Sequence, residues 1–129
     1  MKITSNIIEI NQTPKLMLNT GSSFRILELD QITYLKTWGN YTEIYLTNNK
    51  KIVLSNSIAT YEEHLTQHHF YRIHKTNLVN LNHIEQYNHK TKKIKLKNGE
   101  ELEVARRKYK DLINEFYQRT IIPPTSPTK

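Results

Sequence analysis

The chain has 129 residues, no cysteine and a formal net charge of +7 at neutral pH. This length supports one domain with a modest core, and the lack of cysteine excludes a disulfide framework or a thiolate metal site. No apolar run approaches the roughly 18 residues of a membrane span, and the N-terminal residues lack a signal-peptide pattern. We therefore expect a cytoplasmic protein.

The excess positive charge lies in the second half of the chain. Residues 70–110 hold eleven basic and four acidic side chains, whereas the remainder holds eight of each. A polyanionic partner accounts for this asymmetry, because each phosphate that a cation neutralises releases counterions and adds affinity. A solvated basic face without a partner is the alternative.

The first half of the chain is typical of short antiparallel strands. Residues 1–14 show no period, and we expect a lead-in or linker that ends at Pro14. Turn signals then divide the sequence, and Asn48-Asn49 tolerates the positive φ angles of a tight hairpin. The predicted strands are 15–19, 24–29, 32–38, 41–46 and 51–54.

Residues 57–67 change to a helical period. Ile58, Tyr61 and Leu65 fall on one helical face, and Ser57 is a suitable N-cap. His64 and His68 are four residues apart on this helix, but a histidine pair without a third ligand is a weak metal signal. We expect neither a metal nor a cofactor.

The stretch FYRIHKTNLVN, residues 70–80, has neither a strand period nor a helical one. We expect two strands, about 70–73 and 78–81, joined by a polar turn that holds Lys75, Thr76 and Asn77. We assign His74 to structure, as a buried ring that orients this turn.

A further strand is predicted at 83–87, followed by a turn at 88–91 and a hairpin over 92–103. A three-residue loop, Lys97-Asn98-Gly99, pairs apolar Ile94 with apolar Leu102 and puts glycine at a left-handed position. The same register sets Lys93 against Glu103 and Lys95 against Glu101. These two lysines then have local partners and are weak candidates for phosphate contacts.

A basic cluster, Arg106, Arg107 and Lys108, ends the hairpin and begins a helical pattern that reaches Arg119. The helix dipole disfavours cations at this end, and backbone amides at a helix start donate to phosphate. We therefore expect the cluster to serve an anion. Residues 120–129 hold three prolines and predict a disordered tail.

Catalytic motifs are missing from the sequence. Three scattered glycines are too few for a phosphate-cradling loop, and there is no nucleophile elbow and no HExxH motif. We do not expect an enzyme.

Three stretches, ITYLKTWGNYTEIYL (32–46), FYRIHKTNLVNLNHI (70–84) and KNGEELEVARR (97–107), give the chain a family resemblance. From about Phe24 to Arg119 it resembles the LytTR DNA-binding domains of bacterial transcription regulators. The resemblance implies a mainly β, sandwich-like fold of about ten short antiparallel strands, with one short internal helix and a C-terminal helix. We place this domain at residues 15–119.

The resemblance also implies a function. Such domains bind double-stranded DNA sequence-specifically through loops inserted into the grooves, often as the output domain of a response regulator in a two-component system. Two copies usually bind direct repeats, so we expect a homodimer on DNA. The alternative is a β-rich RNA-binding or protein-interaction module.

The family's contact positions carry over to three loops of this chain. Asn40 and Tyr41 belong to the first loop, Lys75 to the second and Arg106 to the third. Three residues depart from common choices, namely Trp38, Asn77 and Ala105, and we expect them to alter sequence preference. The full set of candidate DNA-binding residues is Asn40, Tyr41, Arg72, Lys75, Asn77, Arg106, Arg107 and Lys108.

Overall fold

The computed structural model describes residues 14–19 and 21–120, and within them the chain is mainly β. Apart from Pro14 and Thr120, the expected lead-in over 1–14 and the expected tail over 120–129 lie outside the described residues. The strands are β1 (Lys15–Asn19), β2 (Phe24–Glu28), β3 (Ile32–Trp38), β4 (Tyr41–Leu46), β5 (Lys51–Leu54), β6 (Phe70–His74), β7 (Asn77–Asn80), β8 (Ile84–Asn88), β9 (Lys93–Leu96) and β10 (Glu101–Glu103). The α-helices are α2 (Ala59–Leu65) and α3 (Tyr109–Arg119), and short 3-10 turns are η1 (Leu29–Gln31), η2 (Thr66–His68), η3 (Leu81–His83) and η4 (Arg106–Lys108).

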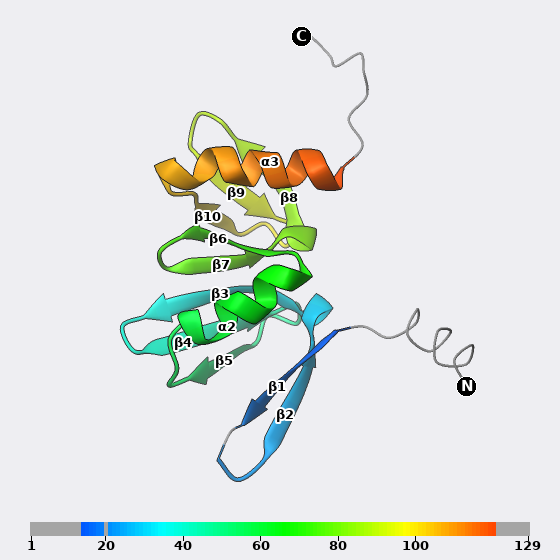
Figure 1. Ribbon diagram of the computed structural model, residues 1–129, viewed down its shortest axis with the longest axis vertical. Coiled ribbons are helices and arrows are strands. Elements are labelled where there is room, and N and C mark those ends of the chain that lie inside the picture. Colours follow the sequence, from blue (N-terminus) through cyan, green and yellow to red (C-terminus); the bar gives the residue numbers. More distant parts are fainter. Residues whose placement is uncertain (1–13, 20, 121–129) are drawn as a thin grey trace, which may run out of the picture.

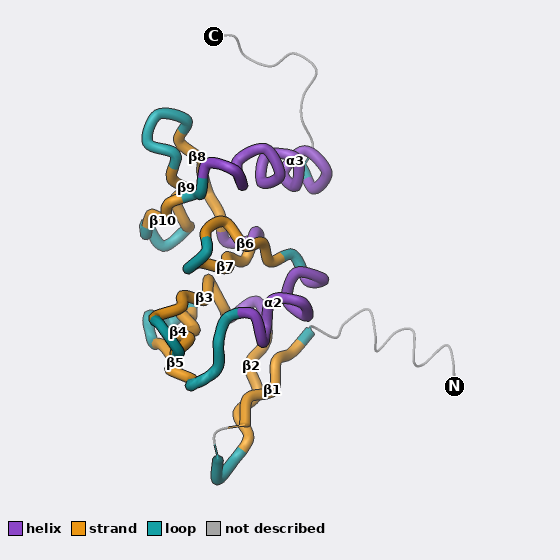
Figure 2. The backbone as a smooth tube through the Cα atoms, turned by 60° about the vertical axis from the view of Figure 1, so that its left-hand side comes forward, coloured by secondary structure: helices purple, strands orange, loops and turns teal. Residues whose placement is uncertain are grey.

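The strands form three antiparallel sheets. A five-stranded sheet has the order β5-β4-β3-β7-β6, a three-stranded sheet has the order β10-β9-β8, and β1 pairs with β2. Figure 1 shows the β1–β2 hairpin at one end of the longest axis, the five-stranded sheet in the middle, and the three-stranded sheet with α3 at the other end. Figure 2 shows the same order after rotation about that axis.

The central sheet has an apolar core on each face. Leu35, Ile44 and Leu78 point to one face, where they pack with Ile58 and Leu65 from the α2 region and with Leu18 and Leu27 from the β1–β2 hairpin. The neighbouring strand positions, Tyr34, Ile73 and Val79, point to the other face and pack with Ile94, Leu96 and Leu112. This alternation follows from the two-residue period of a strand. Each fully buried aliphatic side chain stabilises the fold by about 1.5–3 kcal/mol.

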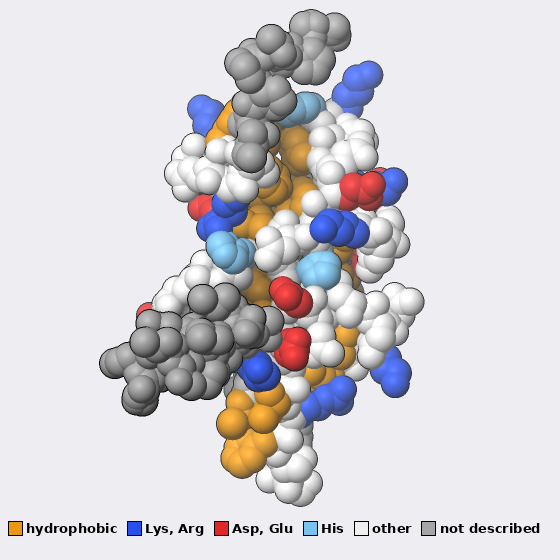
Figure 3. Space-filling model, turned by 90° about the vertical axis from the view of Figure 1, so that its right-hand side faces the viewer, with side chains coloured by type: hydrophobic (Ala, Val, Ile, Leu, Met, Phe, Trp, Pro, Cys, Tyr) orange, Lys and Arg blue, Asp and Glu red, His pale blue; other side chains and the backbone are white. Residues whose placement is uncertain are grey.

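Hydrophobic side chains are also exposed on the outer face of the β1–β2 hairpin. Met17 lies opposite Ile26 and Asn19 opposite Phe24, and all three apolar members are more than half exposed. Figure 3, which views the right-hand side of Figure 1, shows hydrophobic side chains gathered at the lower end of the molecule.

The strand predictions are confirmed with small shifts at their ends. The prediction that Asn77 belongs to the turn after His74 is wrong, because Asn77 begins β7 and pairs with Lys36 of β3. The prediction that Ser57 caps the helix is also wrong. Ile58 occupies the N-cap position with helical φ and ψ, no side chain caps the helix, and Ser57 contributes only its carbonyl oxygen to the Thr60 amide at 3.0 Å.

The register of the β9–β10 hairpin is confirmed, with Ile94 opposite Leu102, Lys95 opposite Glu101 and Lys93 opposite Glu103. Gly99 has a φ of +97°, so the loop has glycine at its left-handed position as expected. The expected charge pairs do not form, since within the described residues neither lysine has a carboxylate within 4 Å. The buried pair Ile94 and Leu102 therefore sets the register without help from ion pairs.

Candidate nucleic-acid interface

Three loops from distant parts of the sequence meet at one edge of the molecule. They are the β3–β4 turn at Gly39-Asn40, the β6–β7 turn at Lys75-Thr76, and residues 105–108. Because β7 runs antiparallel to β3, the start of β7 lies beside the end of β3. The Thr37 amide donates to the Thr76 carbonyl at 2.9 Å, and the Ala105 amide donates to the Ile73 carbonyl at 2.7 Å. These two bonds tie the loops side by side, at the left of Figure 1.

The first loop presents two aromatic rings. Trp38 and Tyr41 face each other across the turn and are 52% and 56% exposed. Trp38 is held on two sides, since its Nε1 donates to Glu43 Oε1 at 2.6 Å and the Lys36 ammonium lies 4.5 Å from its ring centroid. Asn40, which lies between these two residues in the sequence, is exposed at the tip of the turn.

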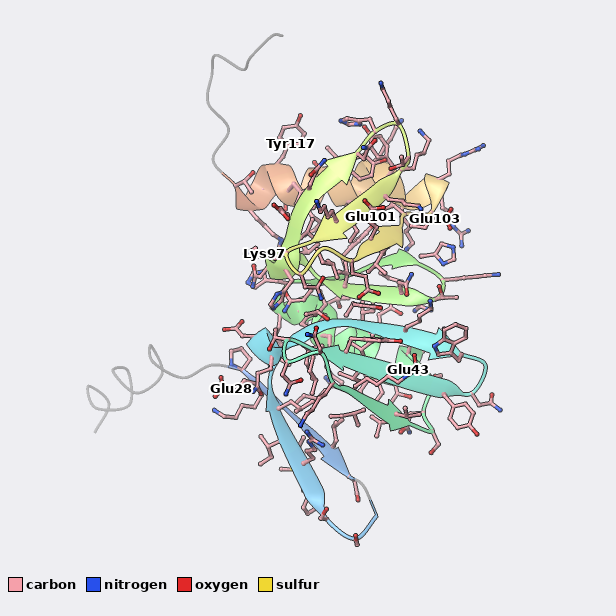
Figure 4. The ribbon with its side chains drawn as sticks, turned by 180° about the vertical axis from the view of Figure 1, so that it is seen from behind. Glu28, Glu43, Lys97, Glu101, Glu103 and Tyr117 are labelled. Atoms are coloured by element: carbon pink, nitrogen blue, oxygen red, sulfur yellow. The ribbon has the colours of Figure 1, made fainter. Side chains whose placement is uncertain are left out.

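A hydrogen-bonded network of side chains on β4 and β5 supports this first loop. Glu43 accepts from the Tyr45 hydroxyl at 2.5 Å and from Lys51 Nζ at 2.9 Å, in addition to Trp38. The Tyr45 hydrogen bond, with help from Lys51 and Trp38, lowers the pKa of Glu43, so this carboxylate is ionised at neutral pH. Burial, with Glu43 close by, raises the pKa of Tyr45 to about 12. Figure 4 shows Glu43 on the central sheet, on the side of the β3–β4 turn.

The network continues to the loop that joins β9 and β10 of the three-stranded sheet. The Tyr45 ring stacks on the Tyr34 ring, with centroids 4.4 Å apart and planes within 5°. The Tyr34 hydroxyl donates to Glu100 Oε2 at 2.6 Å, and burial together with this contact raises its pKa strongly. The first loop therefore rests on a support that spans two sheets.

The second loop is braced by Arg72. The Arg72 guanidinium pairs with Glu62 of α2, and it also donates to the His74 carbonyl at 3.1 Å and to the Lys75 carbonyl. The Thr76 amide donates to His74 Nδ1 at 3.2 Å, and the Thr76 hydroxyl lies 2.9 Å from the same nitrogen. His74 is half-buried and organises the turn, and Lys75 is left exposed at its tip.

The third loop presents Arg106 and Arg107 to solvent. Lys108 is half-buried, with its ammonium 5.7 Å from the Tyr71 ring centroid. Burial and the nearby Asp111 raise the pKa of Tyr71 to about 12. In the described part of the chain no carboxylate lies within 4 Å of Arg106, Arg107 or Lys75, so their charges remain available to an anion.

The family model of the LytTr DNA-binding domain matches residues 22–116. The chain belongs to this family. LytTR domains are DNA-binding domains of response regulators and are not enzymes, which confirms the resemblance found in the sequence and the expectation that the chain is not an enzyme.

A solved structure shares the LytTR fold of this chain. It is the "LytTr DNA-binding domain of putative methyl-accepting/DNA response regulator" from Bacillus cereus, at 20% sequence identity and a TM-score of 0.63. The match covers 82% of this chain and 98% of the Bacillus cereus chain. This likeness confirms the mainly β fold with its ten strands, internal helix and C-terminal helix. No curated protein matches the chain.

Most, but not all, of the candidate residues lie on the edge formed by the three loops, which we call the LytTR edge. Asn40, Tyr41, Lys75, Arg106 and Arg107 are exposed on it, and Lys108 lies at its margin. Arg72 and Asn77 lie behind it. The charge of Arg72 is paired with Glu62, and Asn77 is 6% exposed, with a buried Oδ1 that has no hydrogen-bond partner. Neither presents a free polar group to a ligand outside the loops.

Trp38 was not among the candidate residues, although it lies on this LytTR edge. Its signal in the sequence is that the only tryptophan of the chain directly precedes the Gly39-Asn40 turn. Two further findings concern the described residues alone. They hold no group of three or more histidine, cysteine, aspartate or glutamate side chains arranged to bind a metal, and they form no helix long and apolar enough to cross a membrane.

Proposed function

We propose that this LytTR domain binds double-stranded DNA sequence-specifically through its three loops and acts as a bacterial transcription regulator. The observation that carries the proposal is the single edge on which Asn40, Lys75 and Arg106 are exposed, each on a different loop. Backbone hydrogen bonds hold the loops together before any DNA arrives. Less conformational entropy is therefore lost on binding than if the loops were independent.

The side chains suit different parts of a duplex. Arginine contacts both major-groove acceptors of guanine, lysine donates to the same edge, and asparagine matches adenine. We assign base reading to Arg106, Lys75 and Asn40 on this basis. Arg107 and Lys108 are assigned to phosphates, which fix register without reading sequence.

Two copies are proposed to bind direct repeats, as the resemblance found in the sequence implies. A duplex with two half-sites then takes up two molecules of protein, and a duplex with one half-site takes up one. Analytical ultracentrifugation on both duplexes measures this ratio. A one-to-one complex on the two-site duplex would contradict the proposal of paired binding.

The single tryptophan provides a direct test of the binding edge. Because Trp38 is half exposed on the first loop, its fluorescence should change when duplex DNA covers this edge, and acrylamide should quench it less. The preferred sequence is first obtained by selecting bound molecules from a random duplex pool. The labelled preferred duplex is then competed with random duplex, single-stranded DNA and RNA at fixed salt.

Each outcome of this competition has one meaning. Competition by the preferred duplex alone, with protection of Trp38, supports sequence-specific DNA binding. Stronger competition by RNA would favour the RNA-binding alternative. Absence of binding to any nucleic acid would favour a protein-interaction module.

A further inference from the structure

A second polar feature lies directly beside the third loop. An open cleft of about 370 Å³ is bordered by the end of β6, the β8–β9 turn and the chain that leaves β10. Its lining includes Thr91 and Lys92 from the turn and Arg106 from the third loop. No pattern in the sequence joins the β8–β9 turn to the three loops, since the turn precedes the basic cluster by more than ten residues.

The fold brings the turn and the third loop together. Glu103 at the end of β10 lies opposite Lys93 at the start of β9, so the chain leaving β10 passes the β8–β9 turn. The Val104 amide donates to the Lys92 carbonyl at 3.1 Å, and the next amide, that of Ala105, donates to Ile73. The turn is thus linked to the second and third loops through two consecutive residues.

The β8–β9 turn is held in one conformation before a ligand binds. Asn88 Oδ1 accepts from the amides of Lys90 and Thr91 at 2.8 and 3.0 Å, and the Asn88 carbonyl accepts from the Lys92 amide at 2.8 Å. Lys92 has a φ of +60°, a conformation that non-glycine residues adopt uncommonly. The backbone of Lys92 is therefore fixed, and its exposed side chain starts from a defined place on the rim of the cleft.

The charges around the cleft favour an anion. Within the described residues neither Lys92 nor Arg106 has a carboxylate within 4 Å. Glu103 is the one acidic residue in the lining, so two cations, Lys92 and Arg106, border the cleft against one carboxylate. Lys90 is also exposed on the same turn and adds to the positive potential there.

We propose that this cleft binds a backbone phosphate of the duplex, just outside the segment that the three loops read. Lys92 and Thr91 hold the phosphate from the turn, and Arg106 lies between this contact and the bases. The contact adds affinity without adding sequence preference, because phosphates are the same at every position. It rests on the proposed DNA binding and extends it to a fourth element of the fold.

Charge-neutral phosphates locate this contact. In a series of preferred duplexes, each flanking phosphate in turn is replaced by a methylphosphonate, which has no charge. The wild-type chain should lose roughly fivefold in affinity at one flanking position, the effect expected for one lost phosphate contact. The Lys92→Gln variant should lose no further affinity at that position, because its contact is already missing.

The matched control is Lys97→Gln. Lys97 is an exposed lysine at the other end of β9, and Figure 4 shows it far from Glu103 on the three-stranded sheet. Lys92→Gln should weaken preferred and random duplex by about the same factor and reduce the slope of log affinity against log salt by about one. Lys97→Gln should leave that slope unchanged, and Lys92→Arg should retain the wild-type affinity.

A shortened duplex gives a second readout that a merely structural role of Lys92 does not move. When the flank is cut back to the segment read by the loops, the difference between wild type and Lys92→Gln should vanish. Equal effects of Lys92→Gln and Lys97→Gln on a long duplex would overturn the cleft assignment and leave the proposed function standing. Failure of the wild-type chain to bind any duplex would instead refute the proposed function.

Discussion

Arg72 offers a sharp test of how the second loop is held. The structure makes it a brace: it pairs with Glu62 and donates to the carbonyls of His74 and Lys75, and its side chain is 21% exposed. Arg72→Ala removes all of these bonds and keeps Lys75 in the chain. We expect the variant to fold but to hold its second loop loosely.

The magnitude follows from the three contacts. The pair with Glu62 is partly exposed to water, so we assign it only about 0.5–1 kcal/mol. Each bond from the charged guanidinium to a carbonyl adds about 1 kcal/mol after the same allowance for exposure. Arg72→Ala should therefore lower the unfolding free energy by about 2.5–3 kcal/mol. Urea denaturation, followed by circular dichroism, measures this.

Arg25→Ala is the matched control for the loss of one positive charge. Arg25 is exposed on β2, in the β1–β2 hairpin that lies far from the loops in Figure 1, and its side chain forms no hydrogen bond or ion pair with the described residues. Its replacement should change the unfolding free energy by less than about 0.5 kcal/mol. DNA affinity should fall only slightly, through the net charge.

Glu62→Gln separates bracing from direct contact. If Arg72 acts by holding Lys75 in place, weakening its partner should reduce affinity for the preferred duplex. In addition, the effects of Arg72→Ala and Lys75→Ala should be less than additive. If Arg72 itself binds DNA, Glu62→Gln frees a cation, and affinity should stay the same or rise. That second result, with full additivity, would refute the bracing role.

Three further predictions concern stability and electrostatics. Asn80 is 2% exposed, and its side-chain amide donates to the carbonyls of Leu29 and Ile32 and accepts from the Asn82 amide. Asn80→Leu should therefore lower the unfolding free energy by about 2–4 kcal/mol in urea titrations. A loss below about 1 kcal/mol would contradict this. The folded-state pKa of Glu43 is lowered, so the ionised Glu43 stabilises the fold at pH values above its ordinary pKa. This stabilisation should be lost as the pH falls through the folded-state pKa. Glu43→Gln should flatten the acid side of the plot of unfolding free energy against pH. Tyr45 and Tyr71 have folded-state pKa values raised to about 12. The unfolding free energy should therefore fall between about pH 10 and pH 12, with tyrosinate absorbance rising over the same interval. An unchanged unfolding free energy over this interval would refute both shifts.

The sequence predicted what local periodicity and packing determine. The register of the β9–β10 hairpin followed from pairing Ile94 with Leu102, and Gly99 has the positive φ that its loop demands. The alternation of apolar residues likewise located the strands. In each of these cases the deciding residues lie within about ten positions of one another.

Other features depend on contacts that no sequence period reveals. Arg72 was grouped with the DNA-binding cations because its partner, Glu62, lies on α2 and is brought near only by the fold. The sequence predicts a polar turn at Asn77 because it follows Lys75 and Thr76, but pairing with β3 extends the strand to include it and buries its side chain. Lys93 and Lys95 lie opposite glutamates in the correct register, yet their long side chains do not reach the carboxylates, since ordering exposed side chains costs entropy.

The most direct measurement of loop-mediated base reading is the ratio of affinities for preferred and random duplex. Arg106→Ala and Lys75→Ala should each reduce this ratio by about fivefold or more, because each base contact discriminates by about 1–3 kcal/mol. Lys108→Ala, at the margin of the edge, should weaken both duplexes about equally and lower the salt slope by about one. Paired titrations at fixed salt, with circular dichroism to verify folding, measure both quantities. A parallel loss of affinity for both duplexes in Arg106→Ala and Lys75→Ala would contradict base reading by these loops.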